Sequence, residues 1–174
     1  IRRSTDNGQT WSNAITIADL GTAGASDPAL VVDKASGKII CLFATDKGLF
    51  GSTPTDPIRI RMCTSMDHGV TWTAPVDLTN QLYGAGCSNP VTKNWYAAWV
   101  ASGAAHQLRN GRIVAAVGVR QTSANQIDNF MIYSDDAGVT WQPSTGIAEQ
   151  SGDEAKIVEL NNGNLLMSIR NPGV

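Results

Sequence analysis

A short unit occurs three times along the chain, at residues 4–11, 65–72 and 134–141. Each copy follows the pattern Ser-x-Asp-x-Gly-x-Thr-Trp, and five fixed positions that recur three times indicate a structural repeat. In such a unit Asp accepts hydrogen bonds from its own turn, Gly adopts positive φ without steric cost, and the hydroxyl groups satisfy other polar atoms. The pattern therefore predicts three tight turns, each followed by a Trp that packs on a sheet.

This motif resembles the Asp box, which lies on the outer rim of β-propeller blades in sialidases. The copies begin 61 and 69 residues apart, a spacing that fits one propeller blade with long loops. Propellers close with about four to eight blades, so 174 residues at this period fill only part of a ring. The predicted fold class is all-β: a six-bladed, sialidase-like β-propeller of which this chain covers about three blades.

The sequence enters its first box almost at once and has neither an initiator Met nor a signal peptide. We therefore expect residues 1–174 to be a partial sialidase β-propeller catalytic domain, with N- and C-terminal blades supplied by a longer protein. A net charge of −2 gives no basic surplus for nucleic acid, and the apolar runs are shorter than the roughly 20 residues of a membrane span. Cys41, Cys63 and Cys87 lack metal-site spacing, so we expect buried thiols and neither a metal nor a cofactor.

Several apolar segments have the pattern of strands. Residues 29–33 and 38–44 flank a turn and predict a hairpin, and residues 58–64 alternate between apolar and polar side chains. Asn110-Gly111 predicts a second hairpin that continues to Arg120. The chain thus alternates strands and turns, as a propeller requires.

The segment at residues 151–171 contains two apolar runs around Asn162-Gly163, a strong signal for a hairpin. A two-residue loop would place Glu154 opposite Asn171, whereas a bulge at the glycine would place it opposite Arg170. Both registers bring a carboxylate and a guanidinium to one end of the hairpin, within roughly 5–8 Å at the Cβ atoms. For a lone hairpin, the simpler interpretation is a structural salt bridge.

Two loops carry further candidates. The small-residue loop at 21–28 ends in Asp27-Pro28, at the expected entrance of a strand, where Asp27 could equally cap a turn. The loop at 45–57 carries Leu49 and Phe50, which could anchor the loop or contact a ligand. Core packing is favoured over a sugar site for a cluster of aromatic residues: Tyr83, Trp95, Tyr96 and Trp99.

The three boxes combine with the sequences SDPALVVD, AHQLRNG and DEAKIVELNNGNLLMSIRN at residues 26–33, 105–111 and 153–171. In this order they resemble the middle of a bacterial exo-α-sialidase (neuraminidase), and the similarity covers essentially the whole chain. In that family three arginines bind the sialic acid carboxylate. A Tyr is the nucleophile, a Glu acts as the base of that Tyr, and an Asp is the acid/base catalyst. The resemblance implies that Glu154 is the partner of the Tyr and that Arg170 is the second arginine.

The same resemblance implies substrate contacts by Asp27 and Gln107, and a hydrophobic wall for the N-acyl group at Leu49 and Phe50. The chemistry suits the substrate, because a neutral Tyr approaches a carboxylated sugar without the repulsion that a carboxylate nucleophile meets. Tyr has an unperturbed pKa of about 10 and needs a base, while a guanidinium binds both oxygens of a carboxylate.

The remaining parts of such a site are expected elsewhere. The first arginine and the acid/base Asp should precede Ile1, and the third arginine and the nucleophilic Tyr should follow Val174. None of Tyr83, Tyr96 and Tyr133 has the expected context.

We therefore predict an exo-α-sialidase that removes terminal α-linked sialic acid by a retaining Tyr/Glu mechanism. The expected partners are sialylated glycans and the remaining blades, and the resemblance implies a secreted, periplasmic or cell-surface protein. The alternatives are a non-catalytic Asp-box propeller that binds glycan or protein, and an Asp-box glycosidase that cleaves neutral polysaccharide.

Overall fold

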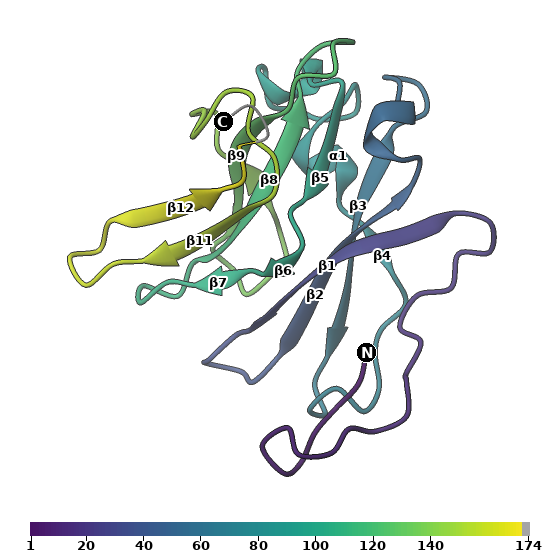
Figure 1. Ribbon diagram of the computed structural model, residues 1–174, viewed down its shortest axis with the longest axis vertical. Coiled ribbons are helices and arrows are strands. Elements are labelled where there is room, and N and C mark those ends of the chain that lie inside the picture. Colours follow the sequence, from purple (N-terminus) through teal and green to yellow (C-terminus); the bar gives the residue numbers. More distant parts are fainter. Residues whose placement is uncertain (172–174) are drawn as a thin grey trace.

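The computed structural model describes residues 1–171 as two five-stranded sheets and a separate hairpin (Figure 1). The first sheet has the order β4-β3-β2-β1-β6, from β1 (Gly24–Val32), β2 (Ile39–Asp46), β3 (Ile58–Ser65), β4 (Val76–Asp77) and β6 (Gly103–Ala104). The second has the order β10-β9-β8-β5, with β7 also on β8, from β5 (Ala97–Val100), β7 (His106–Gln107), β8 (Ile113–Arg120), β9 (Asp128–Ser134) and β10 (Gln142–Pro143). The hairpin pairs β11 (Ala155–Glu159) with β12 (Leu165–Ile169). Three short helical turns complete the elements: η1 (Leu49–Gly51), α1 (Thr79–Leu82) and η2 (Thr92–Asn94).

Each large sheet is built on a four-stranded antiparallel meander, which is the form of a propeller blade. Strands β1 to β4 pair in sequence, as do β5, β8, β9 and β10. The short strand β6 leaves the second meander and pairs parallel with β1, which joins the two sheets. With β11 and β12 as the start of a third unit, the predicted partial, all-β propeller is confirmed.

Strand β8 lies at the centre of the molecule, and all eight of its residues are buried. Alternate side chains of a strand point to opposite faces of the sheet. Ile113 and Val117 accordingly join the main core with strands of the first sheet, whereas Val114 and Ala116 pack against Ile157 of the hairpin. Burial on both faces explains the continuous apolar run of β8 and fixes the hairpin beside the second sheet.

The three boxes form the predicted turns. In the second box Asp67 accepts hydrogen bonds from the Thr71 hydroxyl (2.6 Å), the Thr71 amide (2.9 Å) and the Ser65 hydroxyl (2.8 Å). These bonds, that of the Thr71 hydroxyl foremost, lower the pKa of the Asp67 carboxyl to about 2. The first and third boxes repeat the arrangement around Asp6 and Asp136.

The tryptophans of the boxes differ in their packing. Trp141 is 2% exposed and belongs to the main core, as predicted. Trp11 is 60% exposed, so the prediction that it packs on a sheet is wrong. Among the described residues the first strand begins at Gly24, so the first box, unlike the other two, does not follow a described strand.

The third box contains a strained residue. Ala137 has a φ of 55°, where the first and second boxes place Asn7 and His68. A left-handed conformation costs an L-residue other than Gly about 1–2 kcal/mol, and Asn tolerates it best. We expect Ala137→Gly and Ala137→Asn each to raise the free energy of unfolding by up to about 1 kcal/mol, measured by urea denaturation. Val139→Ala, at an exposed position of the same turn, is the control, and equal changes in all three variants would contradict this explanation.

Strand β1 begins earlier than expected. The loop predicted at residues 21–28 is shorter than expected, because β1 begins at Gly24 and passes through Asp27 by a bulge between Ser26 and Ala29. The bulge gives Asp27 a φ of 54° and places Pro28 where the ladder is interrupted, so the missing amide hydrogen of proline costs no pairing.

The three cysteines are buried free thiols, as predicted. Cys41 and Cys63 lie opposite each other on β2 and β3, and burial raises the pKa of the Cys41 thiol to about 11, with a smaller contribution from Cys63. Within residues 1–171, no helix has the length and apolar character needed to span a membrane.

Candidate functional site

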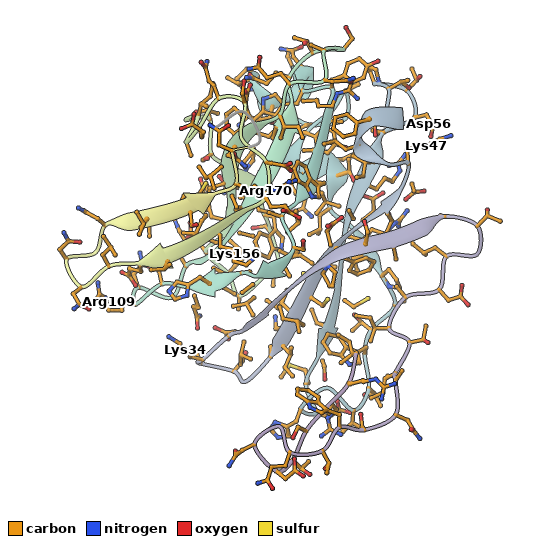
Figure 2. The ribbon with its side chains drawn as sticks, viewed as in Figure 1. Lys34, Lys47, Asp56, Arg109, Lys156 and Arg170 are labelled. Carbon is orange, nitrogen blue, oxygen red and sulfur yellow. The ribbon has the colours of Figure 1, made fainter. Side chains whose placement is uncertain are left out.

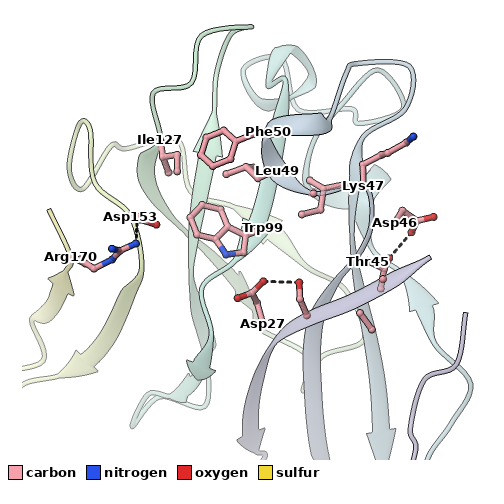
Figure 3. Close-up of a pocket in the computed structure, with 15 residues that line it drawn as sticks. Asp27, Thr45, Asp46, Lys47, Leu49, Phe50, Trp99, Ile127, Asp153 and Arg170 are labelled. Carbon is pink, nitrogen blue, oxygen red and sulfur yellow. Dashed lines mark hydrogen bonds and ion pairs between the residues drawn. The ribbon is translucent and has the colours of Figure 1, made fainter. Parts of the chain in front are cut away.

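An open cleft of about 500 Å³ lies at one end of the strands (Figure 3). The first sheet supplies the start of β1, the end of β2 and the loop that follows it. The second sheet supplies Trp99 of β5 and Ile127, and the hairpin region supplies Asp153 and Arg170. The residues that line the cleft are Gly24, Ala25, Ser26, Asp27, Thr45, Asp46, Lys47, Gly48, Leu49, Phe50, Ile58, Trp99, Ile127, Asp153 and Arg170. Three sequentially distant parts of the chain therefore form one site.

The boxes lie at the other end of the strands. Strand β3 begins in the cleft at Ile58 and reaches the second box at Ser65, about 25 Å away for an eight-residue strand. The residue directly before the first box contacts the second box, since Arg3 donates a 2.7 Å hydrogen bond to the carbonyl oxygen of His68. The third box accepts a bond from Lys38, in the β1–β2 turn. Asp27 and the loop of Leu49 and Phe50 therefore lie at the end of the strands opposite the second and third boxes.

The hairpin adopts the register that brings Glu154 to Arg170. Leu160 donates to the carbonyl oxygen of Asn164, and Gly163 has a φ of 86°, which gives a bulged turn of three residues. The Arg170 amide consequently donates to the Glu154 carbonyl oxygen (2.8 Å), and Nε of Arg170 lies 2.9 Å from Oε2 of Glu154. The alternative register, with Glu154 opposite Asn171, is wrong.

A second carboxylate holds the same guanidinium. Nη2 of Arg170 is hydrogen-bonded to Oδ2 of Asp153, which lines the cleft, whereas Glu154 lines an adjacent pocket that also contains Arg170. Asn129, a buried residue of β9, donates a 2.6 Å hydrogen bond from Nδ2 to the Asp153 carbonyl oxygen. The second sheet therefore fixes the position of the acidic segment. Asp153 was not among the predicted site residues, although its position directly before Glu154 is a signal in the sequence.

This charged group is open to solvent. The side chains of Arg170 and Glu154 are 59% and 52% exposed (Figure 2 shows Arg170 at the base of the hairpin). Exposed ion pairs contribute only about 0–1 kcal/mol to stability. The pair is therefore a weak contribution to folding, and its side chains are accessible to a ligand.

Two aspartates on the facing wall have strained backbones. Asp27 and Asp46 have φ values of 54° and 70°, and each accepts a hydrogen bond from the hydroxyl group of the residue before it, Ser26 or Thr45. Strained conformations of this kind concentrate at functional sites, because the surrounding structure must hold them. The cleft thus has carboxylate oxygens on one wall and a guanidinium on another, an arrangement suited to a sugar that carries both hydroxyl groups and a negative charge.

An apolar wall joins the two charged sides. Leu49 and Phe50 of η1 lie next to Trp99 and Ile127, and Phe50 is 60% exposed (Figure 3). The aromatic cluster therefore divides: Tyr83 and Trp95 are buried in the main core, as favoured, whereas Trp99 reaches the cleft. An exposed Phe beside a preformed apolar surface is a suitable contact for an acyl group.

Trp99 depends on a glycine in the neighbouring strand. Trp99 and Gly118 are cross-strand partners, and a Cβ atom on Gly118 would lie 1.6 Å from Cζ3 of the indole ring. We expect Gly118→Ala to lower the free energy of unfolding by about 1–3 kcal/mol or more and to push Trp99 into the cleft. Urea denaturation with tryptophan fluorescence measures both effects. Gly146→Ala, whose added Cβ meets no atom within 4 Å, should be nearly neutral, and equal stability of the two variants would refute the prediction.

Gln107 lies away from the cleft. Its Nε2 donates to Oδ1 of Asp33 (2.6 Å) and to the Gly111 carbonyl oxygen (3.1 Å), and its Oε1 accepts from the Lys34 amide (2.7 Å). Its side-chain amide group therefore connects the β1–β2 turn to the turn between β7 and β8. Because the side chain is buried and fully used in this contact, Gln107 is left out of the proposed site.

Comparisons with known proteins identify the family of the chain. The chain matches the BNR repeat-like domain family over residues 1–173. It is 33% identical, over an alignment of 187 positions, to a sialidase of Micromonospora viridifaciens and 30% identical, over 181 positions, to one of Paraclostridium sordellii. These alignments cover 97% and 98% of this chain, but the chain spans only 27% and 44% of the lengths of these two relatives.

Solved structures show the same fold. The Hadza microbial sialidase Hz136 superposes with a TM-score of 0.81 at 27% identity, over 98% of this chain and 35% of its own. Trypanosoma rangeli sialidase in complex with sialic acid superposes with a TM-score of 0.76 at 21% identity, over 99% of this chain and 29% of its own. The chain therefore belongs to the BNR repeat-like domain family and is a member of the bacterial sialidase family.

Proposed function

We propose that the intact protein is an exo-α-sialidase, a glycoside hydrolase that releases terminal α-linked sialic acid from glycans. The observation that carries the proposal is Arg170, held by two acidic neighbours at the mouth of a cleft that also contains Asp27 and an apolar wall. A binding module would need the same contacts to sugar, but it would not need a base beside the guanidinium. The carboxylate of Glu154 beside Arg170 therefore favours an enzyme over a binding module.

The proposed substrate contacts follow from the chemistry of each wall. Arg170 binds the sugar carboxylate, because a guanidinium has five N–H donors and retains donors after pairing with Asp153 and Glu154. Leu49 and Phe50 contact the N-acyl group, and Asp27 accepts hydrogen bonds from ring hydroxyl groups. These assignments need no metal or cofactor.

For the reaction we propose a retaining mechanism with Glu154 as the base of a Tyr nucleophile. In the first step Glu154 accepts the phenolic proton as the Tyr oxygen attacks the anomeric carbon, while the glycosidic bond breaks and the acid/base Asp protonates the departing glycan oxygen. In the second step the same Asp takes a proton from the attacking water, and Glu154 returns its proton to the Tyr oxygen as the glycosyl–tyrosine bond breaks. We propose that the Tyr, the acid/base Asp and two further arginines come from parts of a longer protein. The lengths of the relatives support this division, since the chain spans less than half of each.

The last hairpin presents a surface for such additional blades. Val158, Leu160, Leu165 and Leu166 are exposed on β11, β12 and their turn. We propose that the following blade covers this surface, and we expect residues 1–174 expressed alone to self-associate or aggregate. Size-exclusion chromatography with light scattering measures this. A monodisperse monomer with a cooperative melting transition would count against the proposal.

The experiment is proton NMR of the intact protein with 3′-sialyllactose. The proposal predicts free sialic acid, with the α-anomer as the first product. First release of the β-anomer would contradict the retaining mechanism. Saturation transfer to the trisaccharide without any release would identify the non-catalytic glycan-binding alternative.

A further inference from the structure

Arg120 ends strand β8 and is only 3% exposed, which is unusual for an arginine. Its guanidinium donates to three backbone carbonyl oxygens: Nη1 to Leu49 (2.8 Å), Nη2 to Ser123 (2.7 Å) and Nε to Ala124 (2.9 Å). Leu49 belongs to the loop after β2, whereas Ser123 and Ala124 belong to the loop between β8 and β9. One buried side chain therefore joins loops from the two large sheets.

Aromatic rings complete the surroundings of the charge. The carbon atom Cζ of Arg120 lies 4.9 Å from the centre of the Tyr96 ring and 6.0 Å from that of Phe50. Within residues 1–171, the salt bridges do not include Arg120. Carbonyl dipoles and π faces thus compensate the charge in place of a carboxylate.

The two loops held by Arg120 form the apolar wall of the cleft. Leu49 and Phe50 come from the loop after β2, and Ile127 is the last residue of the loop between β8 and β9. We propose that Arg120 is a positioning residue that sets the selectivity of the cleft for the N-acyl group of sialic acid. This inference rests on the proposed function and adds the residue that determines which sugar substituent is recognised.

The kinetic test compares two fluorogenic substrates on the intact protein: an N-acetylated sialoside and its analogue with a hydroxyl group in place of the acylamino group. Lys has a compact charge and cannot reproduce the three-way fork of Arg120. Arg120→Lys is expected to lower the ratio of kcat/KM for the N-acetylated sialoside to kcat/KM for its hydroxyl analogue by about 10-fold or more. The main cause should be a higher KM for the N-acetylated substrate. Equal losses on both substrates would overturn the proposal.

Arg112 offers a matched control at the other end of β8. Its guanidinium also contacts a ring, that of Tyr133 at 4.2 Å, and it forms a salt bridge with Asp135 of the third box (2.7 Å). Arg112→Lys should leave the substrate ratio unchanged. Phe50→Ala removes the exposed ring without disturbing the hydrogen bonds of Arg120, so this variant should fold and lower the same ratio. An unchanged ratio in Phe50→Ala would also overturn the proposal.

Hydrogen exchange gives a readout that does not require activity. The amide of Gly51 donates to the Gly48 carbonyl oxygen (3.0 Å), and the amide of Ala124 donates to the Thr122 hydroxyl (3.2 Å), so each reports on one loop. Both amides should exchange faster in Arg120→Lys than in wild type or Arg112→Lys. Unchanged exchange at both would refute the positioning role, whereas an inactive wild type with this exchange pattern would refute only the proposed function.

Discussion

Replacing Glu154 with Gln in the intact protein is expected to lower kcat for sialoside hydrolysis by about 10²–10⁴-fold, the usual contribution of a general base. An amide has nearly the same shape as a carboxylate but cannot accept the proton of the Tyr nucleophile. Because the side chain is half exposed and its ion pair is weak, substrate affinity and the free energy of unfolding should change little. Steady-state kinetics, calorimetric binding and urea denaturation measure the three quantities.

Glu159 is the matched control for this substitution. It ends the same strand, β11, where its carboxylate accepts a 2.8 Å hydrogen bond from the Arg109 amide and lies 3.3 Å from Nε of Arg109. Glu159→Gln should therefore leave kcat unchanged. Turnover like that of wild type in Glu154→Gln would end the catalytic assignment, and parallel losses of stability and activity would make Glu154 a structural residue.

Replacing Arg170 with Lys is expected to weaken binding of free sialic acid and to lower kcat/KM by about 10–100-fold, the effect of losing one charge-assisted hydrogen bond. The ammonium group keeps the positive charge but cannot bind both carboxylate oxygens while remaining paired with Asp153 and Glu154. Calorimetric titration with sialic acid measures the affinity directly.

Arg109 is a suitable control for Arg170, since it lies near the tip of the same hairpin (Figure 2). Arg109→Lys should bind sialic acid as wild type does. If Arg170→Lys also bound sialic acid with unchanged affinity, the guanidinium would not be a carboxylate contact and the proposed site would lose its main anchor.

The parts of the fold that depend on local chemistry could be predicted from sequence. Each box forms its turn through bonds between residues four positions apart, as in Asp67 and Thr71, so the pattern is sufficient. The strands of the two meanders also follow from their apolar patterns. The hairpin register was open between two choices because it depends on the backbone of Gly163, whose bulge the residue types do not determine.

The features that could not be predicted depend on long-range packing. Arg120 had no sequence signal, because the carbonyl oxygen of Leu49 that it binds lies 71 residues away. Trp99 reaches the cleft only because Gly118 leaves room for its ring on the neighbouring strand. Gln107 shows the opposite case: a local resemblance suggested a substrate contact, but tertiary structure directs its side chain to Asp33.

The most direct test of the central claim is a paired assay of the intact protein with two substrates that share one fluorogenic leaving group, a 2-α-sialoside and a neutral β-galactoside. The cleft with Arg170 and its apolar wall predicts rapid hydrolysis of the sialoside and none of the galactoside. Cleavage of the galactoside with no cleavage of the sialoside would contradict the account and favour a glycosidase of neutral polysaccharide.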